Sequence, residues 1–434
     1  MNMYFYKKNH SYLNKNFICY IFFKNKIYII ILFYRGKNKM ILLVYSMPFL
    51  LYLCSSIFST VLVINASEMG ANAFFISLLA VFYGMGMMVS ASTFSKFKIP
   101  KRIYPRLLYI QSCVQAILSM LSIIYLNNEL SLLYSFLYGS NTTIFFVCFQ
   151  SLLDNVSKDL PVRISSGLFI FSWTLGLSVG PIVTGIVYNF NSRIGFFIVI
   201  VMSVLMFILF YLSRHLHFKP RRKWEEAFMR APRYKVYIGW LIIFVGALVL
   251  HTLRFMFLDY GMKEVGLSKG SATFLVGMLS GVMAFGALFS AFYFRILEKK
   301  RVFTIVGLLT PIALTLLLIS NNFWVFLISF TFLGFVSGFG YFFGLYYALA
   351  DQERDSSNVA INEGLTGAAA LVIPFIVGYL ASNFSYFIAF LFMMIISLIC
   401  YSIAIYLMWQ RKRTSLIKEK FNRLIEEADK KYKA

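Results

Sequence analysis

Twelve apolar runs of about 20 residues, separated by short polar breaks, constrain the fold of this chain more than any other feature. An apolar run of that length crosses the hydrocarbon core of a bilayer as one α-helix. The composition agrees, because 60% of the residues are hydrophobic and only 13% are charged, against roughly a quarter in soluble domains. We therefore expect membrane spans at residues 41–64, 71–94, 104–126, 131–153, 165–188, 194–213, 236–258, 270–294, 303–320, 323–349, 361–382 and 386–409.

The positions of Lys and Arg predict the orientation of these spans. All but four of the 41 lie before the first span, after the last span or in the breaks that follow even-numbered spans. Cytoplasmic loops of membrane proteins are enriched in Lys and Arg, so we expect a multi-pass protein of the cell membrane with both termini in the cytoplasm. The net charge of +24 comes from these short runs rather than from a basic surface on a soluble fold. Nucleic acid is therefore not an expected partner.

Residues 1–39 differ from the rest of the chain. Phe, Ile, Tyr, Asn and Lys dominate this stretch, and Asp, Glu, Ala, Val, Thr and Pro are absent from it. Codons that contain only A and T mostly encode those five amino acids. We expect this basic extension not to fold as a domain and to be read through from an upstream start, with Met40 or Met47 as the real one.

The chain resembles itself at a spacing of about 196 residues, which indicates an internal repeat. Four pairs of segments match in the same order and in corresponding spans or breaks. They are Glu68-Met-Gly70 with Glu264-Val-Gly266, Lys101-Arg-Ile-Tyr104 with Lys300-Arg-Val-Phe303, Phe145-Phe…Asp154 with Phe342-Phe…Asp351, and Pro181…Gly185 with Pro374…Gly378.

The repeat predicts the domain organisation. Two parallel six-span halves, residues 40–213 and 236–409, are joined by a basic cytoplasmic linker at 214–235. In the tail, residues 410–434, Ile417, Phe421, Leu424 and Ala428 recur at helical spacing among charged residues, which predicts a cytoplasmic amphipathic helix. The predicted fold class is an all-α polytopic membrane protein, with 12 transmembrane helices in two pseudo-symmetric six-helix bundles.

Span 5 carries the sharpest motif, Gly176-Leu-Ser-Val-Gly180-Pro181-Ile-Val-Thr184-Gly185. This segment and the two six-span halves resemble the major facilitator superfamily of secondary transporters, whose exporter-type pattern is gxxxGPxxGG. Only Thr184 departs from that pattern. Glycines allow helices to approach closely and proline permits a bend. We expect Gly176, Gly180, Pro181 and Gly185 to form a close-contact hinge region, packed near Pro374 and Gly378 of span 11; the alternative is an ordinary tightly packed helix.

Other motifs of that family are not conserved in this chain. The break between spans 2 and 3 has the basic residues of the family motif but lacks its Asp. Span 4 has Ser135 at the position where the resemblance implies Arg in proton-coupled members. The family's proton-coupling residues are therefore not carried over, and the coupling ion is left open.

Polar groups within spans are candidates for substrate binding, because charge in hydrocarbon is costly. No acid falls near the middle of a span, which favours neutral, anionic or amphipathic cargo over a simple cation. Arg254 has an alternative role, at the outer membrane interface or paired with Asp259. Polar groups that bond helices together are the general alternative. In the family, spans 1, 4, 7 and 10 line the central cavity, and with Trp173 of span 5 the candidates are Ser55, Asn141, Thr142, Trp173, His251, Arg254, Tyr341 and Tyr347.

Equivalent charges at the inner ends of spans 4 and 10 predict a cytoplasmic gate. In the family, the loop between spans 2 and 3 lies against neighbouring helix ends and its charges help to hold the cytoplasmic side closed. The alternative is solvated loop charges that only set topology. We expect Glu363, near the start of span 11, to reach the same loop. The expected pairs are Asp154 with Lys96, Lys98 or Arg102, and Asp351 with Arg295, Lys299 or Arg301.

The resemblance implies a secondary active transporter that moves a small organic solute by alternating access, and the span 5 motif favours an efflux permease. A sugar or metabolite uptake permease is one alternative, and a transporter-like sensor or scaffold without flux is another. No catalytic or metal-binding constellation lies at a common depth, so we expect neither an enzyme nor a metal or other cofactor. The expected partners are the substrate, membrane lipid and a coupling ion, and the expected state is a monomer.

Overall fold

The computed structural model describes residues 19–23, 26–30, 37–97, 103–156, 162–213, 233–350 and 355–432. Within these ranges, 12 helices are long and apolar enough to cross a membrane, which confirms the predicted spans and the all-α class. A short antiparallel hairpin of β1 (Cys19–Phe23) and β2 (Lys26–Ile30) is an addition that the sequence analysis did not anticipate in the N-terminal extension.

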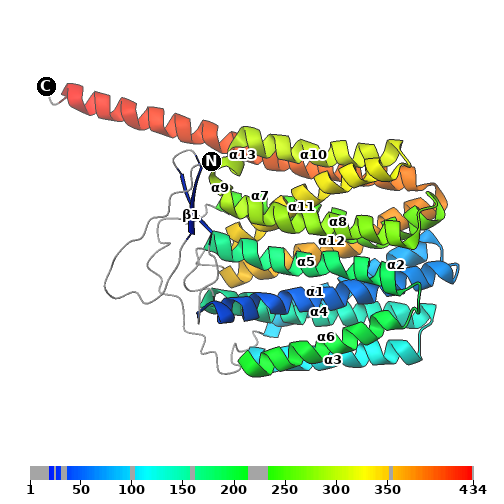
Figure 1. The fold of residues 1–434 in the computed structure, drawn as a ribbon. Helices are drawn as coiled ribbons and strands as arrows, with labels where there is room; N and C mark the ends of the chain where they lie inside the picture. The colour runs from blue at the N-terminus through cyan, green and yellow to red at the C-terminus, as the bar shows by residue number, and fades with distance from the viewer. Residues whose placement is uncertain are drawn as a thin grey trace.

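The helices divide into two sets of six that correspond to the predicted halves (Figure 1). The first half contains α1 (Lys37–Glu68), α2 (Ala73–Phe97), α3 (Tyr104–Ile124), α4 (Asn128–Val156), α5 (Val162–Val187) and α6 (Ile194–Ser213). The second contains α7 (Arg233–Lys263), α8 (Lys269–Phe292), α10 (Lys300–Ile319), α11 (Phe323–Ala350), α12 (Asp355–Asn383) and α13 (Tyr386–Tyr432), with the single turn α9 (Phe294–Leu297) after α8.

The two ends of the bundle differ. The chain starts α1, ends α6, starts α7 and leaves along α13 at one end, which we call the linker end (Figure 1). At the opposite end, the loop end, short turns join α1 to α2 and α7 to α8. The helix expected from Thr414 is continuous with the last span, because α13 runs unbroken for 47 residues and projects beyond the other helices.

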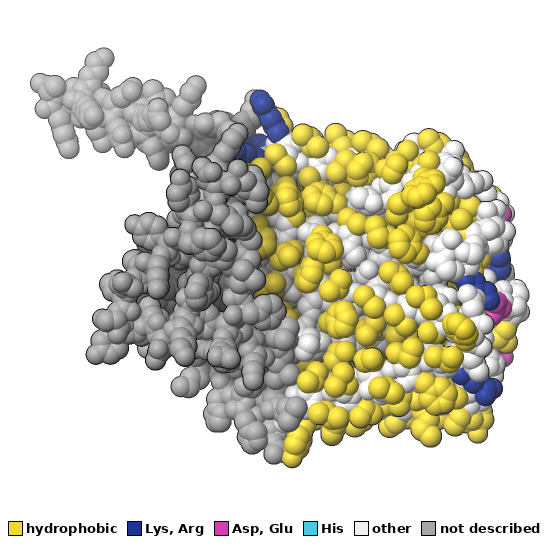
Figure 2. Space-filling model, viewed as in Figure 1, with side chains coloured by type: hydrophobic (Ala, Val, Ile, Leu, Met, Phe, Trp, Pro, Cys, Tyr) yellow, Lys and Arg dark blue, Asp and Glu magenta, His cyan; other side chains and the backbone are white. Residues whose placement is uncertain are grey.

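The surface explains why these segments are helices. Apolar side chains cover the middle of the face in Figure 2, and charged side chains on that face lie towards its ends. Large hydrophobic residues such as Phe197 and Ile305 expose more than half of their side chains on the outside of the bundle. Lipid offers no hydrogen bonds, so a chain that exposes such residues to lipid must pair its backbone groups within each helix.

The backbone confirms the internal repeat at two equivalent turns. Gly70 follows α1 with φ of 81°, and Gly266 follows α7 with φ of 74°. This left-handed conformation costs glycine little, and it allows the backbone N–H groups after a helix to bond back to its last carbonyls. Ala71 N–H donates to Ala66 O at 3.0 Å, and Leu267 N–H donates to Gly261 O at 2.8 Å.

The two halves pack together mainly along α5 with α8 and along α2 with α12, pairs that the repeat makes equivalent. Small residues allow these helices to approach at several depths. A Cβ atom on Gly277 of α8 would lie 2.7 Å from Ser178 O of α5, and one on Gly84 of α2 would lie 2.7 Å from Ala370 C of α12. Such spacing leaves no room for a side chain, so backbone contacts backbone across the boundary.

The glycine motif of span 5 packs differently from the expectation. Gly176 and Gly180 face α1 within the first half, where a Cβ on Gly180 would collide with Ser56. Gly185 faces Thr273 of α8, while Gly378 of α12 faces Ser77 of α2. Span 5 (α5) therefore does not pack on span 11 (α12) in the described structure. Instead, α5 packs on α8 and α12 packs on α2, each in the opposite half. Pro181 and Pro374 both lie inside their helices.

The close contact between α5 and α8 makes a testable prediction. Gly277→Leu should force the two helices apart, at a cost of about 1–3 kcal/mol, which is usual for an overpacked interior. We expect a lower thermal unfolding midpoint for the purified protein. Gly270→Leu is the matched control on the same helix, since a Cβ there would lie no closer than 4.0 Å to another group. Equal midpoints for the two variants would contradict the packing.

Candidate substrate site

A narrow cavity lies between the two halves, on the linker side of the loop-end contacts. Both halves contribute to it, with side chains from α1, α2, α4 and α5 on one side and from α7, α11 and α12 on the other. The lining residues are Tyr52, Met87, Phe146, Phe169, Ile170, Trp173, Leu177, Ile243, Leu250, His251, Arg254, Tyr341, Leu345, Asn362, Glu363 and Thr366.

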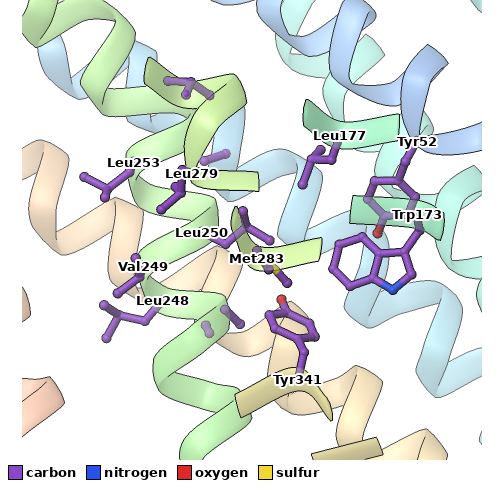
Figure 3. Packing of buried hydrophobic residues seen from close by; sticks show 14 of the residues in the cluster. Tyr52, Trp173, Leu177, Leu248, Val249, Leu250, Leu253, Leu279, Met283 and Tyr341 are labelled. Atoms are coloured by element: carbon purple, nitrogen blue, oxygen red, sulfur yellow. The ribbon is translucent and has the colours of Figure 1, made fainter. Parts of the chain in front are cut away.

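Aromatic rings form much of the cavity wall. The ring of Tyr52 lies 4.9 Å from that of Trp173 and 5.2 Å from that of Phe146. Trp173 meets Tyr341 of the other half edge to face at 5.2 Å. Figure 3 shows Tyr52, Trp173 and Tyr341 converging from three helices, beside Leu250 and Met283. These rings give the site a large apolar contact surface, and the Trp173–Tyr341 contact joins the two halves.

Arg254 is a buried basic residue of the site. It is only 2% exposed, and its Nη2 donates to Ser55 O of α1 at 2.7 Å and to Ser59 Oγ. Its guanidinium also lies 5.7 Å from the ring centroid of Tyr83, within range of a cation–π interaction. These contacts offset part of the cost of the charge, which is about 2.5–3.5 kcal/mol or more at the centre of a membrane helix. They also connect the second half to α1.

The polar groups of the cavity are incompletely bonded. Within the described part of the chain, Arg254 Nε, His251 Nδ1 and Asn362 Oδ1 have no hydrogen-bond partner, although each residue is at most 5% exposed. Glu363 lines the same cavity and is 8% exposed. Buried polar groups are normally satisfied, so a cluster of three unsatisfied atoms indicates a place for a polar ligand or water.

The loop end is closed by polar contacts between the halves. Lys269 of α8 pairs with Glu68 of α1, and Tyr188 donates to Glu68 Oε2 at 2.8 Å. Asp259 of α7 accepts from Ser67 of α1 at 2.7 Å. We call the set Ser67, Glu68, Tyr188, Asp259, Lys263 and Lys269 the loop-end clasp.

Asp259 is the buried centre of the loop-end clasp. It is 2% exposed, pairs with Lys263 at 2.8 Å and accepts from Tyr386 at 2.8 Å. Lys263 in turn donates to Ala71 O of the first half at 2.6 Å. Asp259 is therefore not the partner of Arg254. Five residues turn an α-helix by about 500°, which places the two side chains on different faces of α7.

The structure brings half of the predicted substrate residues into the cavity. Trp173, His251, Arg254 and Tyr341 line it. Ser55 lies behind it as the partner of Arg254. Asn141 and Thr142 are bonded within the first half, to Gln111 O at 3.1 Å and to Tyr138 O at 2.9 Å.

Tyr347 lies at the linker end, away from the cavity, where its hydroxyl donates to Glu298 at 3.0 Å. Glu298 also pairs there with Lys235. This pair joins the start of α7 to the turn before α10, so it lies within the second half rather than between the halves.

Four residues of the predicted gate fall outside the description. Lys98, Arg102, Asp351 and the side chain of Asp154 lie outside the described residues. Lys96, Arg295, Lys299 and Arg301 are exposed. Glu363 does not sit at the helix end as expected, because α12 begins at Asp355 and residue 363 is two turns inside it. Glu363 is nevertheless the third residue of the candidate span Ile361–Asn383, which agrees with the expectation that no acid falls near the middle of a span.

Sequence reasoning missed three polar cavity residues on α12, namely Asn362, Glu363 and Thr366. Hydropathy placed the start of span 11 at residue 361, and polar residues at a span boundary are ordinarily solvated. The signal that could have found them is the i, i+4 spacing of Asn362 and Thr366, which puts both on one face. Thr366 Oγ1 donates to Asn362 O at 3.0 Å.

The described residues contain no group of three or more His, Cys, Asp or Glu side chains that could hold a metal ion. What the cavity offers is a charged guanidinium, a carboxylate, unsatisfied hydrogen-bonding atoms and aromatic walls. A cavity with such a lining can contact a polar ligand or water.

The contacts of Arg254 make a second prediction. Ser59→Ala removes a hydroxyl partner from a buried guanidinium and should lower stability by about 1–3 kcal/mol. The measurement is the thermal unfolding midpoint of the purified protein. Ser122→Ala is the control, because that buried hydroxyl donates to Leu118 O of its own helix. If both substitutions have the same small effect, Ser59 does not stabilise Arg254.

Comparison with known proteins agrees with this architecture. The sequence profile of the Major Facilitator Superfamily matches residues 44–357 and 260–430. A search of curated proteins found no match. Among solved structures, the chain is similar to a crystal structure of a bacterial homologue of the human lysosomal transporter Spinster, in an inward-facing and occupied conformation. The TM-score is 0.62 at 12% identity, over 88% of this chain and 98% of that one. The chain therefore belongs to the major facilitator superfamily of secondary transporters.

Proposed function

We propose that the protein exports a small organic solute across the cell membrane by alternating access, acting as a lipid-embedded monomer with both termini in the cytoplasm. The observation that carries the proposal is the cavity between the halves, which the loop-end clasp separates from the loop end. A site at the boundary of two repeats that rock against each other is open to one side of the membrane at a time.

The described conformation corresponds to the inward-facing state in this proposal. The Lys and Arg bias assigns the linker end to the cytoplasm, and the clasp is at the other end. The cavity residues lie on the linker side of the clasp. The Spinster homologue to which the chain is similar was captured in an inward-facing state.

Two features support rocking of the halves. The pairs α5–α8 and α2–α12 are related by the repeat and lie on opposite sides of the cavity. The two halves can therefore rotate against each other about these two equivalent contacts. The clasp also includes the partly exposed pair Glu68–Lys269, whose groups can exchange partners with water. The direction of transport rests on the exporter-type pattern from Gly176 to Gly185.

Flux measurement tests the function directly. The purified protein in proteoliposomes should move members of a labelled solute panel, with flux lost in Trp173→Ala, which removes a ring shared by Tyr52 and Tyr341. Accumulation against the expected direction would favour an uptake permease. Stable binding of a soluble protein without flux of any solute would favour a sensor or scaffold.

The clasp makes a third prediction. Lys269→Glu places two carboxylates side by side and should shift the equilibrium towards the state open at the loop end. Both side chains are partly exposed, so we expect a shift of up to about 1 kcal/mol, or about fivefold. Distances between spin labels on the two halves at the loop end measure the shift.

Glu68→Lys combined with Lys269→Glu should restore the original distances, because the pair is re-formed with reversed charges. Arg193→Glu is the control for charge alone, since Arg193 is exposed at the same end. An unchanged distance distribution in Lys269→Glu would show that the pair does not hold the halves together.

A further inference from the structure

We propose that the cargo is an organic anion that also carries a neutral hydrogen-bond donor, with its anionic group on Arg254, its donor on Asn362 and its apolar body against the aromatic wall of the cavity. This inference rests on the proposed function, because it names the substrate class of the same cavity.

The anionic group is inferred from the surroundings of Arg254. Its Nη2 donates to neutral groups of Ser55 and Ser59, and no Asp or Glu among the described residues forms an ion pair with it. Its Nε–H has no acceptor in the described structure, although Arg254 is 2% exposed and lines the cavity. A guanidinium has only donors, and a carboxylate or phosphate oxygen is their strongest acceptor.

His251 supplies a second contact for the same anionic group. It lies three residues before Arg254 on α7, a spacing that places both side chains on one face of the helix. Its Nδ1 has no hydrogen-bond partner among the described residues, and His251 is 4% exposed and lines the cavity. In the tautomer that carries its proton on Nδ1, the imidazole donates from that atom. A carboxylate has two oxygens, so it can accept from Arg254 and His251 together.

The neutral donor is inferred from Asn362 of α12. Its Oδ1 is an acceptor without a partner in the described structure, in a residue that is 1% exposed and lines the cavity. A hydroxyl or an amide N–H brings one donor, which matches one unbonded acceptor atom. An ammonium group brings three donors, each of which needs an acceptor when it is buried. A hydroxyl or amide N–H is therefore the better match.

Glu363 lines the same cavity but interacts with other groups of the protein. It acts electrostatically on the hydroxyls of Tyr52 and Tyr341, which belong to different halves. The ligand contacts are therefore assigned to the buried atoms that have no partner in the described part of the chain. These atoms are a donor on Arg254 and an acceptor on Asn362.

The apolar body is inferred from the aromatic wall of the cavity. Tyr52, Phe146, Trp173 and Tyr341 line it from four helices of both halves. Aromatic surfaces of this kind provide a large apolar contact area for an aliphatic or aromatic body. The polar atoms therefore select the functional groups of the cargo, and the rings accept the rest of it.

Two matched sets of compounds test the inference in binding measurements on the purified full-length protein. The first is phenyllactate with phenylpropionate, which lacks the hydroxyl, and phenyllactamide, which lacks the charge. The second is para-hydroxyphenylacetate with phenylacetate and para-hydroxyphenylacetamide, in which the hydroxyl is farther from the charge. We expect the hydroxy acid of at least one set to bind about tenfold tighter than both of its relatives, equal to about 1.4 kcal/mol.

Asn362→Leu tests the donor contact with little risk to folding. Leucine has nearly the shape of asparagine, and it replaces an amide oxygen that has no partner in the described structure with an apolar group. In this variant the hydroxy acid and the acid without the hydroxyl should bind equally, because the hydroxyl has lost its acceptor. The preference for the hydroxy acid over its carboxamide should remain.

Substitutions of Arg254 test the anion contact. Arg254→Gln should weaken both acids of a set about tenfold and leave the carboxamide unchanged. Arg254→Lys keeps the charge but removes Nε–H, so it should weaken the acids less. Lys235→Gln, which affects the pair with Glu298 at the linker end, is the control and should leave all affinities unchanged. The two contacts are measured separately, so misfolding of an Arg254 variant leaves the Asn362 test intact.

The outcomes separate the two proposals. Tighter binding of phenethylamine than of the acids, no advantage of the hydroxy acid in either set, or an advantage that persists in Asn362→Leu would overturn this inference. Selective binding of a hydroxy acid without flux would keep it and overturn transport. Flux of a neutral or cationic solute without binding of either hydroxy acid would keep transport and overturn this inference.

Discussion

Helices inside a membrane cannot be driven together by the hydrophobic effect, because lipid tails are as apolar as the side chains that they would replace. The fold depends instead on close contact, and α5–α8 and α2–α12 obtain it from small residues. Gly277 and Gly84 bring backbone against backbone where any side chain would collide. The contacts α5–α8 and α2–α12 hold the two halves together on either side of the cavity.

The polar contacts of the boundary have a different character. The Glu68–Lys269 pair of the loop-end clasp is partly exposed and exchanges readily with water, whereas Arg254 is bonded to α1 in the interior. Breaking the clasp costs little for each exposed pair, but separating Arg254 from Ser55 requires a replacement partner. In the proposed alternating access, a ligand group that accepts from the guanidinium would supply that partner and so link occupancy of the cavity to movement of the halves.

Much of the fold could be predicted from the sequence, because hydropathy and span length are direct consequences of bilayer thickness. The repeat also emerged, since Gly70 and Gly266 occupy equivalent turns with positive φ. The site was harder. Glu363 was expected at a helix end because hydropathy does not detect the polar first two turns of α12. Asn141 was expected to bind substrate, but its amide donates to Gln111 O within the first half. The sequence predicts how deep in the membrane a residue lies along its helix. Which neighbouring helix its side chain faces depends on how the helices pack.

The unbroken course of α13 has a mechanical consequence. Its 47 residues extend for about 70 Å, and the segment after Gln410 accounts for about 33 Å of that length. The membrane part of the helix packs on α10, so the helix must tilt with the second half. A tilt of about 10° would displace the tip by about 6 Å. In the proposed rocking of the halves, the helix would act as a lever that converts a small rotation inside the bilayer into a large displacement at its tip.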